Sequence, residues 1–80
     1  MKTIIIDNIA TSNRLRRKFA ECGFKPKDVQ SAMQLESVQA VYKWINPKNK
    51  TIPSTDSIMQ LAYLMNCTVE DIIVTREIEL

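Results

Sequence analysis

The 80-residue sequence has no histidine, and it contains only one glycine, three prolines and two cysteines. It therefore has no nucleophile with a matched base and no glycine-rich phosphate loop, and we predict that the protein is not an enzyme and uses no cofactor. Cys22 and Cys67 lie far apart with no histidine or C-x-x-C partner, which excludes a four-ligand metal site. Each ends an apolar helical pattern, so we expect two buried free thiols.

Long hydrophobic runs are missing as well. The apolar run at Ile4–Ile6 is too short for a signal peptide, and no segment approaches the roughly 20 apolar residues of a membrane helix. We therefore expect a cytoplasmic protein without membrane contact. The composition, 45% hydrophobic and 25% charged residues, is typical of one globular domain spanning residues 1–80. Because a domain of this size buries only about 60 to 65% of its unfolded surface, dimerisation would help it.

Positive charge is concentrated in the middle of the chain. Residues 11–50 contain nine basic side chains against three acidic ones, a net charge of +6, whereas the remainder has a net charge of −4. The basic residues are Arg14, Arg16, Arg17, Lys18, Lys25, Lys27, Lys43, Lys48 and Lys50. Such a segment is typical either of a surface that binds a polyanion, because lysine and arginine release counterions from phosphates, or of an ordinary solvated surface.

Apolar periodicity predicts five helices within residues 12–73. The first would start at one of three cap candidates and end at Gly23 in the left-handed conformation; the candidates are Thr11, Ser12 and Asn13. The second would cover residues 27–33 with Pro26 in its first turn. The third would start at a capping Ser37 and direct Ala40, Val41 and Trp44 inward.

A loop follows, and two more helices are predicted after it. Ser54 and Asp56 would open the fourth helix and Asn66 would end it. Thr68 would cap the fifth, with Asp71 at the capping-box position. Residues 2–6 and 74–80 have the composition and alternation of short strands, which could pair with Lys2 opposite an acidic strand. Because a lone two-stranded ribbon is marginal in water, it would pack on the helices or on a second copy.

Residues 24–44 contain two short apolar-periodic segments separated by a few polar residues. This spacing is typical of a helix-turn-helix, in which one helix acts as a brace and the outer face of the next can enter the major groove of DNA. The longer segments L-R-R-K-F-A-E-C-G-F, V-Q-A-V-Y-K-W and I-P-S-T-D-S-I-M-Q-L-A-Y-L-M-N-C-T-V-E-D-I-I resemble the phage repressor and Cro type of helix-turn-helix protein, also called Xre-like. The resemblance covers residues 12–73 and implies an all-α, five-helix repressor-like domain to which the end strands are added.

The resemblance implies that bases are contacted by residues near the start of the third helix and one turn later. These positions are Val38, Gln39 and Lys43. A glutamine can form two hydrogen bonds with adenine, and a lysine can reach the O6 and N7 atoms of guanine. Gln39 could instead be a plain solvent-facing residue, and Val38 could contact a thymine methyl group or simply pack.

The phosphate contacts implied by the same resemblance come from two helix starts and one loop. The residues are Lys25, Lys27, Ser37, Tyr42, Lys48, Asn49 and Lys50. Helix N-termini attract phosphates through free amides and the helix dipole, and such contacts position a protein without selecting a sequence. Tyr42 could either donate to a phosphate or be a partly buried surface residue.

The sequence departs from the family pattern at four places. Pro26 replaces a phosphate-binding glutamine, Gln34 replaces the turn glycine, the loop after Trp44 is longer and lacks its glycine, and the end strands are additional. A longer basic loop with Lys48 and Lys50 could reach farther along the DNA backbone in compensation for the first departure.

The function predicted from these features is sequence-specific binding of double-stranded DNA by a small transcriptional regulator. We expect a repressor that binds a palindromic operator as a homodimer and uses no small-molecule substrate. The alternative is a protein-interaction module, such as an antitoxin-like or regulator-binding protein, whose apolar faces and end strands bind a partner. An exposed apolar patch would favour this alternative.

Overall fold

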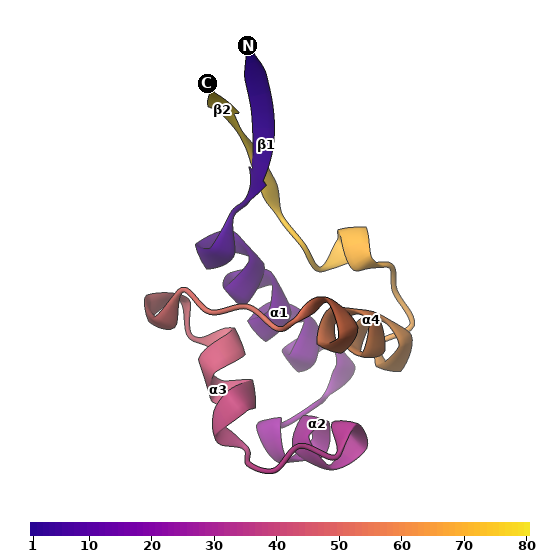
Figure 1. Cartoon of the computed structure of the whole chain (residues 1–80). Coiled ribbons are helices and arrows are strands. Elements are labelled where there is room, and N and C mark those ends of the chain that lie inside the picture. Colours follow the sequence, from indigo (N-terminus) through magenta and orange to yellow (C-terminus); the bar gives the residue numbers. More distant parts are fainter.

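The computed structural model describes all residues 1–80 and consists of a helical body with a projecting two-stranded ribbon (Figure 1). The strands are β1 (Lys2–Ile6) and β2 (Thr75–Glu79). The body contains four α-helices and two single 3-10 turns: α1 (Asn8–Cys22), α2 (Pro26–Met33), α3 (Gln39–Ile45), η1 (Pro47–Asn49), α4 (Thr55–Leu64) and η2 (Val69–Asp71). None of these helices is both long and apolar enough to span a membrane.

The prediction of five helices was wrong, because the fifth is only the 3-10 turn η2. Its start was predicted correctly: Thr68 and Asp71 form the reciprocal capping box. The helix cannot continue because the chain soon becomes extended. The N–H of Val74 already donates to Thr11 Oγ1 at 3.0 Å, and β2 begins at the next residue.

Helix α1 begins earlier than predicted, because its N-cap is Asp7. The Oδ1 atom of Asp7 accepts a hydrogen bond from the N–H of Ala10 at 3.0 Å. The predicted caps Thr11, Ser12 and Asn13 therefore lie inside the helix, where the first two are buried. The side chain of this aspartate, directly after the strand, accepts from one free amide of the first turn, so no later cap is needed.

Four other predicted helix ends are confirmed. Gly23 closes α1 in the left-handed conformation with a φ of 72°. Pro26 is in the first turn of α2, Ser54 caps α4 by accepting from the N–H of Ser57, and Asn66 follows α4 with a φ of 53°. The turn chemistry of the chain thus defines most of its helix boundaries.

One core cluster joins all four helices. It consists of Leu15, Phe19, Val29, Val41, Trp44, Ile58, Leu61, Ala62, Met65 and Ile72. The inward positions predicted for α3 are largely confirmed, since Val41 and Trp44 are buried and Ala40 is half-buried. The prediction of two buried thiols was wrong: Cys22 is exposed and Cys67 is half-buried.

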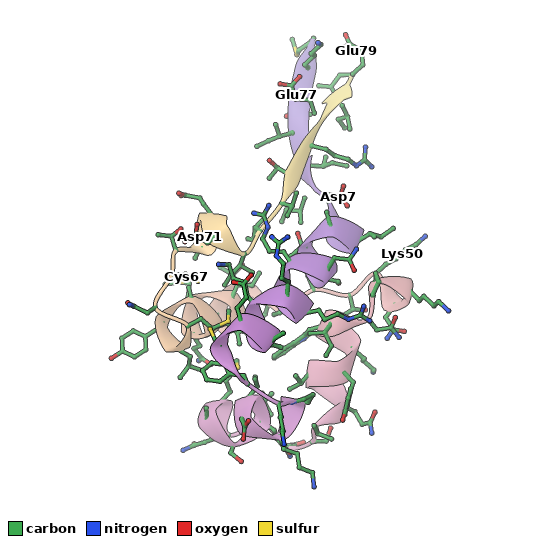
Figure 2. The ribbon with its side chains drawn as sticks, turned by 180° about the vertical axis from the view of Figure 1, so that it is seen from behind. Asp7, Lys50, Cys67, Asp71, Glu77 and Glu79 are labelled. Atoms are coloured by element: carbon green, nitrogen blue, oxygen red, sulfur yellow. The ribbon has the colours of Figure 1, made fainter.

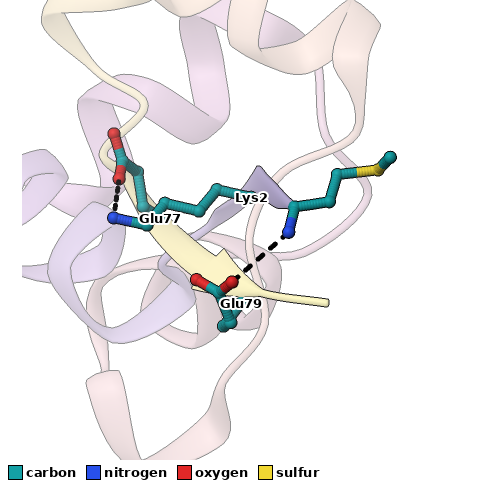
Figure 3. Close-up of polar contacts among 4 residues, drawn as sticks. Lys2, Glu77 and Glu79 are labelled. Carbon is teal, nitrogen blue, oxygen red and sulfur yellow. Dashed lines mark hydrogen bonds and ion pairs between the residues drawn. The ribbon is translucent and has the colours of Figure 1, made fainter.

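The two ends of the chain pair as an antiparallel ribbon that extends away from the helices, with both termini at its tip (Figure 1). Lys2 lies opposite Glu79 in the register and forms a 4.0 Å ion pair with Glu77 (Figure 3). The terminal amino group of Met1 forms a second pair with Glu79 at 3.4 Å. The predicted pairing of the ends with an acidic strand opposite Lys2 is therefore confirmed, but no helix packs on the strands.

Candidate nucleic-acid interface

Helices α2 and α3 form the predicted helix-turn-helix, with the inner side of each anchored in the core. Val29 on α2 and Val41 and Trp44 on α3 are buried. Gln34 ends α2 in the left-handed conformation with a φ of 54°, the position where a glycine would be least strained. Its N–H donates to Ser31, and the N–H of Leu35 donates to Gln30, so the last carbonyls of α2 are satisfied without that glycine.

The outer face of α3 is polar and open to solvent. Gln39, Tyr42 and Lys43 are exposed, as is Asn46 just after the helix. These residues follow one another at the i, i+3, i+4 and i+7 positions, so they lie along one side of the helix. Tyr42 is 49% exposed, so its exposure does not decide between a phosphate contact and a partly buried surface residue. Both polar residues predicted to contact bases, Gln39 and Lys43, are therefore directed away from the core.

The predicted cap of α3 was wrong. Val38, rather than Ser37, is the N-cap residue, and no side chain bonds to the first turn. Val38 has helical dihedral angles but no side-chain acceptor, and the Ser37 hydroxyl forms no hydrogen bond to the amides that follow it. Ser37 remains exposed beside these uncapped amides, and Val38 is half-buried.

The start of α2 differs electrostatically from the start of α3. The carboxylate of Asp28 accepts a 2.8 Å hydrogen bond from the N–H of Lys25, so a negative charge already occupies this helix end. The side chains of Lys25 and Lys27 are exposed and form no ion pair. Contacts to a phosphate at α2 would therefore come from these lysine side chains rather than from the helix end itself.

The loop after α3 is ordered by its own hydrogen bonds. Asn46 Oδ1 accepts from the N–H of Lys48 and caps η1, while Lys50 adopts a left-handed conformation with a φ of 53°. The side chain of Asn8, at the start of α1, donates to the carbonyl of Lys50 at 3.1 Å. Lys48, Asn49 and Lys50 are exposed. The loop therefore holds its two lysines next to the end of α3.

Few of the basic side chains are neutralised within the chain. Among the nine in residues 11–50, only Arg17 forms an ion pair, with Glu21 at 3.7 Å. Arg14 and Lys18 are close enough to Asp71 to lower the pKa of its carboxyl group. Figure 2 shows Asp71 and Cys67 on one side of the body and Lys50 on the other, so these two cations belong to a different surface.

Two titratable groups on that second surface have shifted pKa values. The backbone N–H of Thr68, followed by its hydroxyl group, holds the pKa of the Asp71 carboxyl below its ordinary value, and nearby Lys18 and Arg14 lower it further. Burial raises the pKa of the Cys67 thiol. These shifts reflect local structure near η2 and lie outside the α2–α3 surface.

Sequence reasoning missed the two asparagines that shape the interface. Asn46 both caps η1 and extends the exposed side of α3, and Asn8 fixes the loop to α1. The first had a recognisable signal, because an asparagine followed by a proline is a typical helix start. The Asn8 bond joins residues 42 positions apart and has no local signal.

Comparison with known proteins gave one match. A family model described as a Cro/C1-type helix-turn-helix DNA-binding domain matches residues 14–77. No curated protein and no solved structure gave a match. The matched range includes α2, α3, the following loop and most of β2, and it confirms the resemblance predicted from the sequence.

Proposed function

Because the chain belongs to the Cro/C1-type helix-turn-helix DNA-binding family, we propose that it represses transcription as a dimer bound to a palindromic operator. The family establishes a DNA-binding regulator, and the repressor role, the dimer and the symmetry of the operator are the proposed additions. A protein of this size can regulate by occupying a site, which requires binding and no catalytic step. Cytoplasmic location and double-stranded DNA as the partner are consistent with this role.

The observation that carries the proposal is the division of α3 into two sides. Val41 and Trp44 are buried on one side, whereas Gln39 and Lys43 are exposed on the other. A helix anchored in this way can enter the major groove, where the edges of all four base pairs are distinguishable. We propose that Gln39 binds an adenine, that Lys43 binds a guanine one turn later, and that the half-buried Val38 contacts a thymine methyl group.

The proposed phosphate contacts surround this helix. They are Lys25, Lys27, Ser37, Tyr42, Lys48, Asn49 and Lys50. Their exposure and the lack of internal ion pairs support this role, since an unpaired cation keeps its full charge for the polyanion. Asp28 makes the start of α2 the weakest of these contacts.

The test of base recognition starts with selection of bound sequences from a random pool of DNA duplexes. We expect one enriched inverted repeat. Gln39→Ala should then weaken specific binding by about 1 to 3 kcal/mol and relax selection at one position of each half-site, with little change in nonspecific affinity. Gln60→Ala, which removes an exposed glutamine from α4, is the matched control. Equal losses of specific and nonspecific affinity would exclude base recognition by Gln39.

The test of the phosphate contacts compares two double variants that each remove two positive charges. Lys48→Ala with Lys50→Ala should reduce the slope of log affinity against log salt concentration by about 2. Arg14→Ala with Lys18→Ala should leave that slope nearly unchanged, because these cations lie near Asp71. An unchanged slope in the first variant would exclude the loop from the interface.

A second candidate function is protein interaction, and an apolar cleft between α2 and α4 supports it. The cleft is lined by Ala32, Met33, Gln34, Met59, Gln60, Tyr63 and Leu64. Met59 is 58% and Tyr63 is 86% exposed, which is unusual for large apolar side chains that lie next to each other on a helix. A partner bound there would leave the outer face of α3 free.

A further inference from the structure

We propose that two copies of the chain associate through the free edge of β1, forming a four-stranded antiparallel sheet centred on Ile4. This inference gives the dimer of the proposed function a defined surface. Strand β1 is unpartnered on its outer side, and the ribbon stands away from the helices (Figure 1). Two-stranded ribbons are marginally stable in water, whereas sheets of three or more strands with an apolar face are stable.

The hydrogen-bond pattern identifies the residues at the free edge. The N–H of Asp7 donates to Val74, and the N–H of Leu80 donates to Met1, so the odd-numbered residues of β1 bond inward to β2. Hydrogen-bonded pairs alternate along an antiparallel ladder. The backbone groups of the even-numbered residues Lys2, Ile4 and Ile6 therefore point outward and have no partner.

The side chains of these even-numbered residues lie together on one face of the ribbon. Ile4 is 60% and Ile6 is 41% exposed, although both are large and apolar. In a sheet centred on Ile4, the isoleucine of one copy lies directly opposite that of the other, and Ile6 lies opposite the aliphatic stem of Lys2. The same pairing satisfies all the outward backbone groups of the three residues.

The positions of the charged residues favour β1, rather than β2, as the strand edge at which the two copies pair. Two copies related by a twofold axis perpendicular to the sheet pair antiparallel, and the residue on the axis lies opposite itself. In β2, an axis at Arg76 or Glu77 pairs that residue with its own copy, and an axis at Ile78 pairs Glu77 with Glu79 of the second copy. Each arrangement opposes like charges, which is destabilising.

Strand β1 has no such conflict. Lys2 is its only charged residue, and it lies opposite Ile6 when the axis passes through Ile4. The outer edges of the four-stranded sheet would then be the two copies of β2, with Glu77 and Glu79 on them. Charged edges discourage further strand addition, so the assembly ends at two copies rather than growing into a fibre.

The test uses the full chain without DNA, so that loss of dimerisation and loss of DNA binding are recognised separately. Ile4→Lys places a lysine opposite Glu77 within its own ribbon but opposite its own copy across the twofold axis. By sedimentation equilibrium we expect a dimer for the wild type and loss of that dimer for Ile4→Lys, with unchanged circular dichroism. Thr75→Lys, which introduces the same charge at the free edge of β2, should remain dimeric.

A second measurement covers the case in which Ile4→Lys fails to fold. Ile4→Cys in a Cys22→Ser background should form an intermolecular disulfide on mild oxidation, because Cα atoms of a hydrogen-bonded pair lie about 5.5 Å apart, within disulfide range. Thr75→Cys in the same background should not. A monomeric wild type, or a dimer broken by Thr75→Lys but not by Ile4→Lys, would overturn the proposal. A wild-type dimer that enriches no DNA sequence would overturn the proposed function but would not contradict the interface proposed for β1.

Discussion

The helical body and the terminal ribbon are stabilised in different ways. The body has a core of ten buried residues to which all four helices contribute. No residue of the ribbon is buried, and only Ile5 and Ile78 are half-buried. Its two ion pairs join side chains that are 66% or more exposed, and pairs of that kind contribute about 0 to 1 kcal/mol. The body is therefore stable through its own packing, whereas the ribbon depends on main-chain pairing and on what it contacts next.

The two regions are connected by a small set of partly buried hydrogen bonds at the base of the ribbon. Thr11 is fully buried in α1, and its hydroxyl both accepts from the N–H of Val74 at 3.0 Å and donates to the carbonyl of that residue at 3.4 Å. The N–H of Asp7 donates to the same carbonyl at 2.8 Å. Through these bonds the direction of the ribbon is fixed relative to α1.

The largest effect of a single substitution is expected in the core of the body. Leu61→Ala removes a completely buried side chain and should lower the free energy of unfolding by about 2 to 5 kcal/mol. A domain of this length has about 4 to 12 kcal/mol in total, so the variant should be close to unfolding. Urea denaturation followed by fluorescence of the only tryptophan, the buried Trp44, measures this change.

The matched substitution in the ribbon is Ile4→Ala, at dilutions where the chain is monomeric. Because Ile4 is exposed there, the change in unfolding free energy should be within about 0.5 kcal/mol. If Ile4→Ala and Leu61→Ala lowered the free energy of unfolding by similar amounts, the ribbon would be part of the same cooperative core as the helical body.

An intermediate effect is expected at the junction between the two regions. Thr11→Val keeps the shape of the side chain but leaves the N–H of Val74 without its acceptor, at a cost of about 1 to 3 kcal/mol. Hydrogen exchange of the β1 and β2 amides should accelerate more than that of α4. Ser12→Ala is the control, because the buried Ser12 hydroxyl has no hydrogen-bond partner, and its removal should be neutral or stabilising. A neutral Thr11→Val would mean that the ribbon is held by other contacts.

The sequence predicted most of the body because its signals are local. Apolar residues at helical spacing identified the inward sides of the helices, and Gly23, Pro26, Ser54 and Asn66 defined helix ends through their own conformational preferences. The errors occurred where distant residues decide the outcome. The chain becomes extended after η2 because of bonds between residues 63 positions apart, which shortened the predicted fifth helix.

In the candidate interface, too, only the features with a local signal could be predicted from the sequence. The exposed side of α3 was predictable, because the burial of Val41 and Trp44 leaves Gln39 and Lys43 outside. The missing capping bond at Ser37 was not predictable, since whether a serine hydroxyl reaches the first amides depends on the conformation of the turn between α2 and α3. Which bases and phosphates these residues contact stays a prediction for the binding experiments.

A smaller effect than those at Leu61 and Thr11 is expected at Asp71, whose capping box stabilises the turn that leads from α4 to the ribbon. Its carboxyl pKa is lowered from 3.8 in the folded protein, mainly by the hydrogen bond from the Thr68 N–H. The folded state therefore binds this proton less readily than the unfolded chain. The resulting stabilisation is complete above the unfolded pKa and is lost as the pH falls through the lower folded pKa.

Asp71→Asn should thus be less stable than the wild type at pH 7, and urea denaturation at successively lower pH should show the difference in unfolding free energy shrinking below about pH 4. Asp56→Asn, on the exposed first turn of α4, controls for the loss of one charge at a helix start. A difference that grows as the pH falls would contradict the stabilising role of the ionised Asp71.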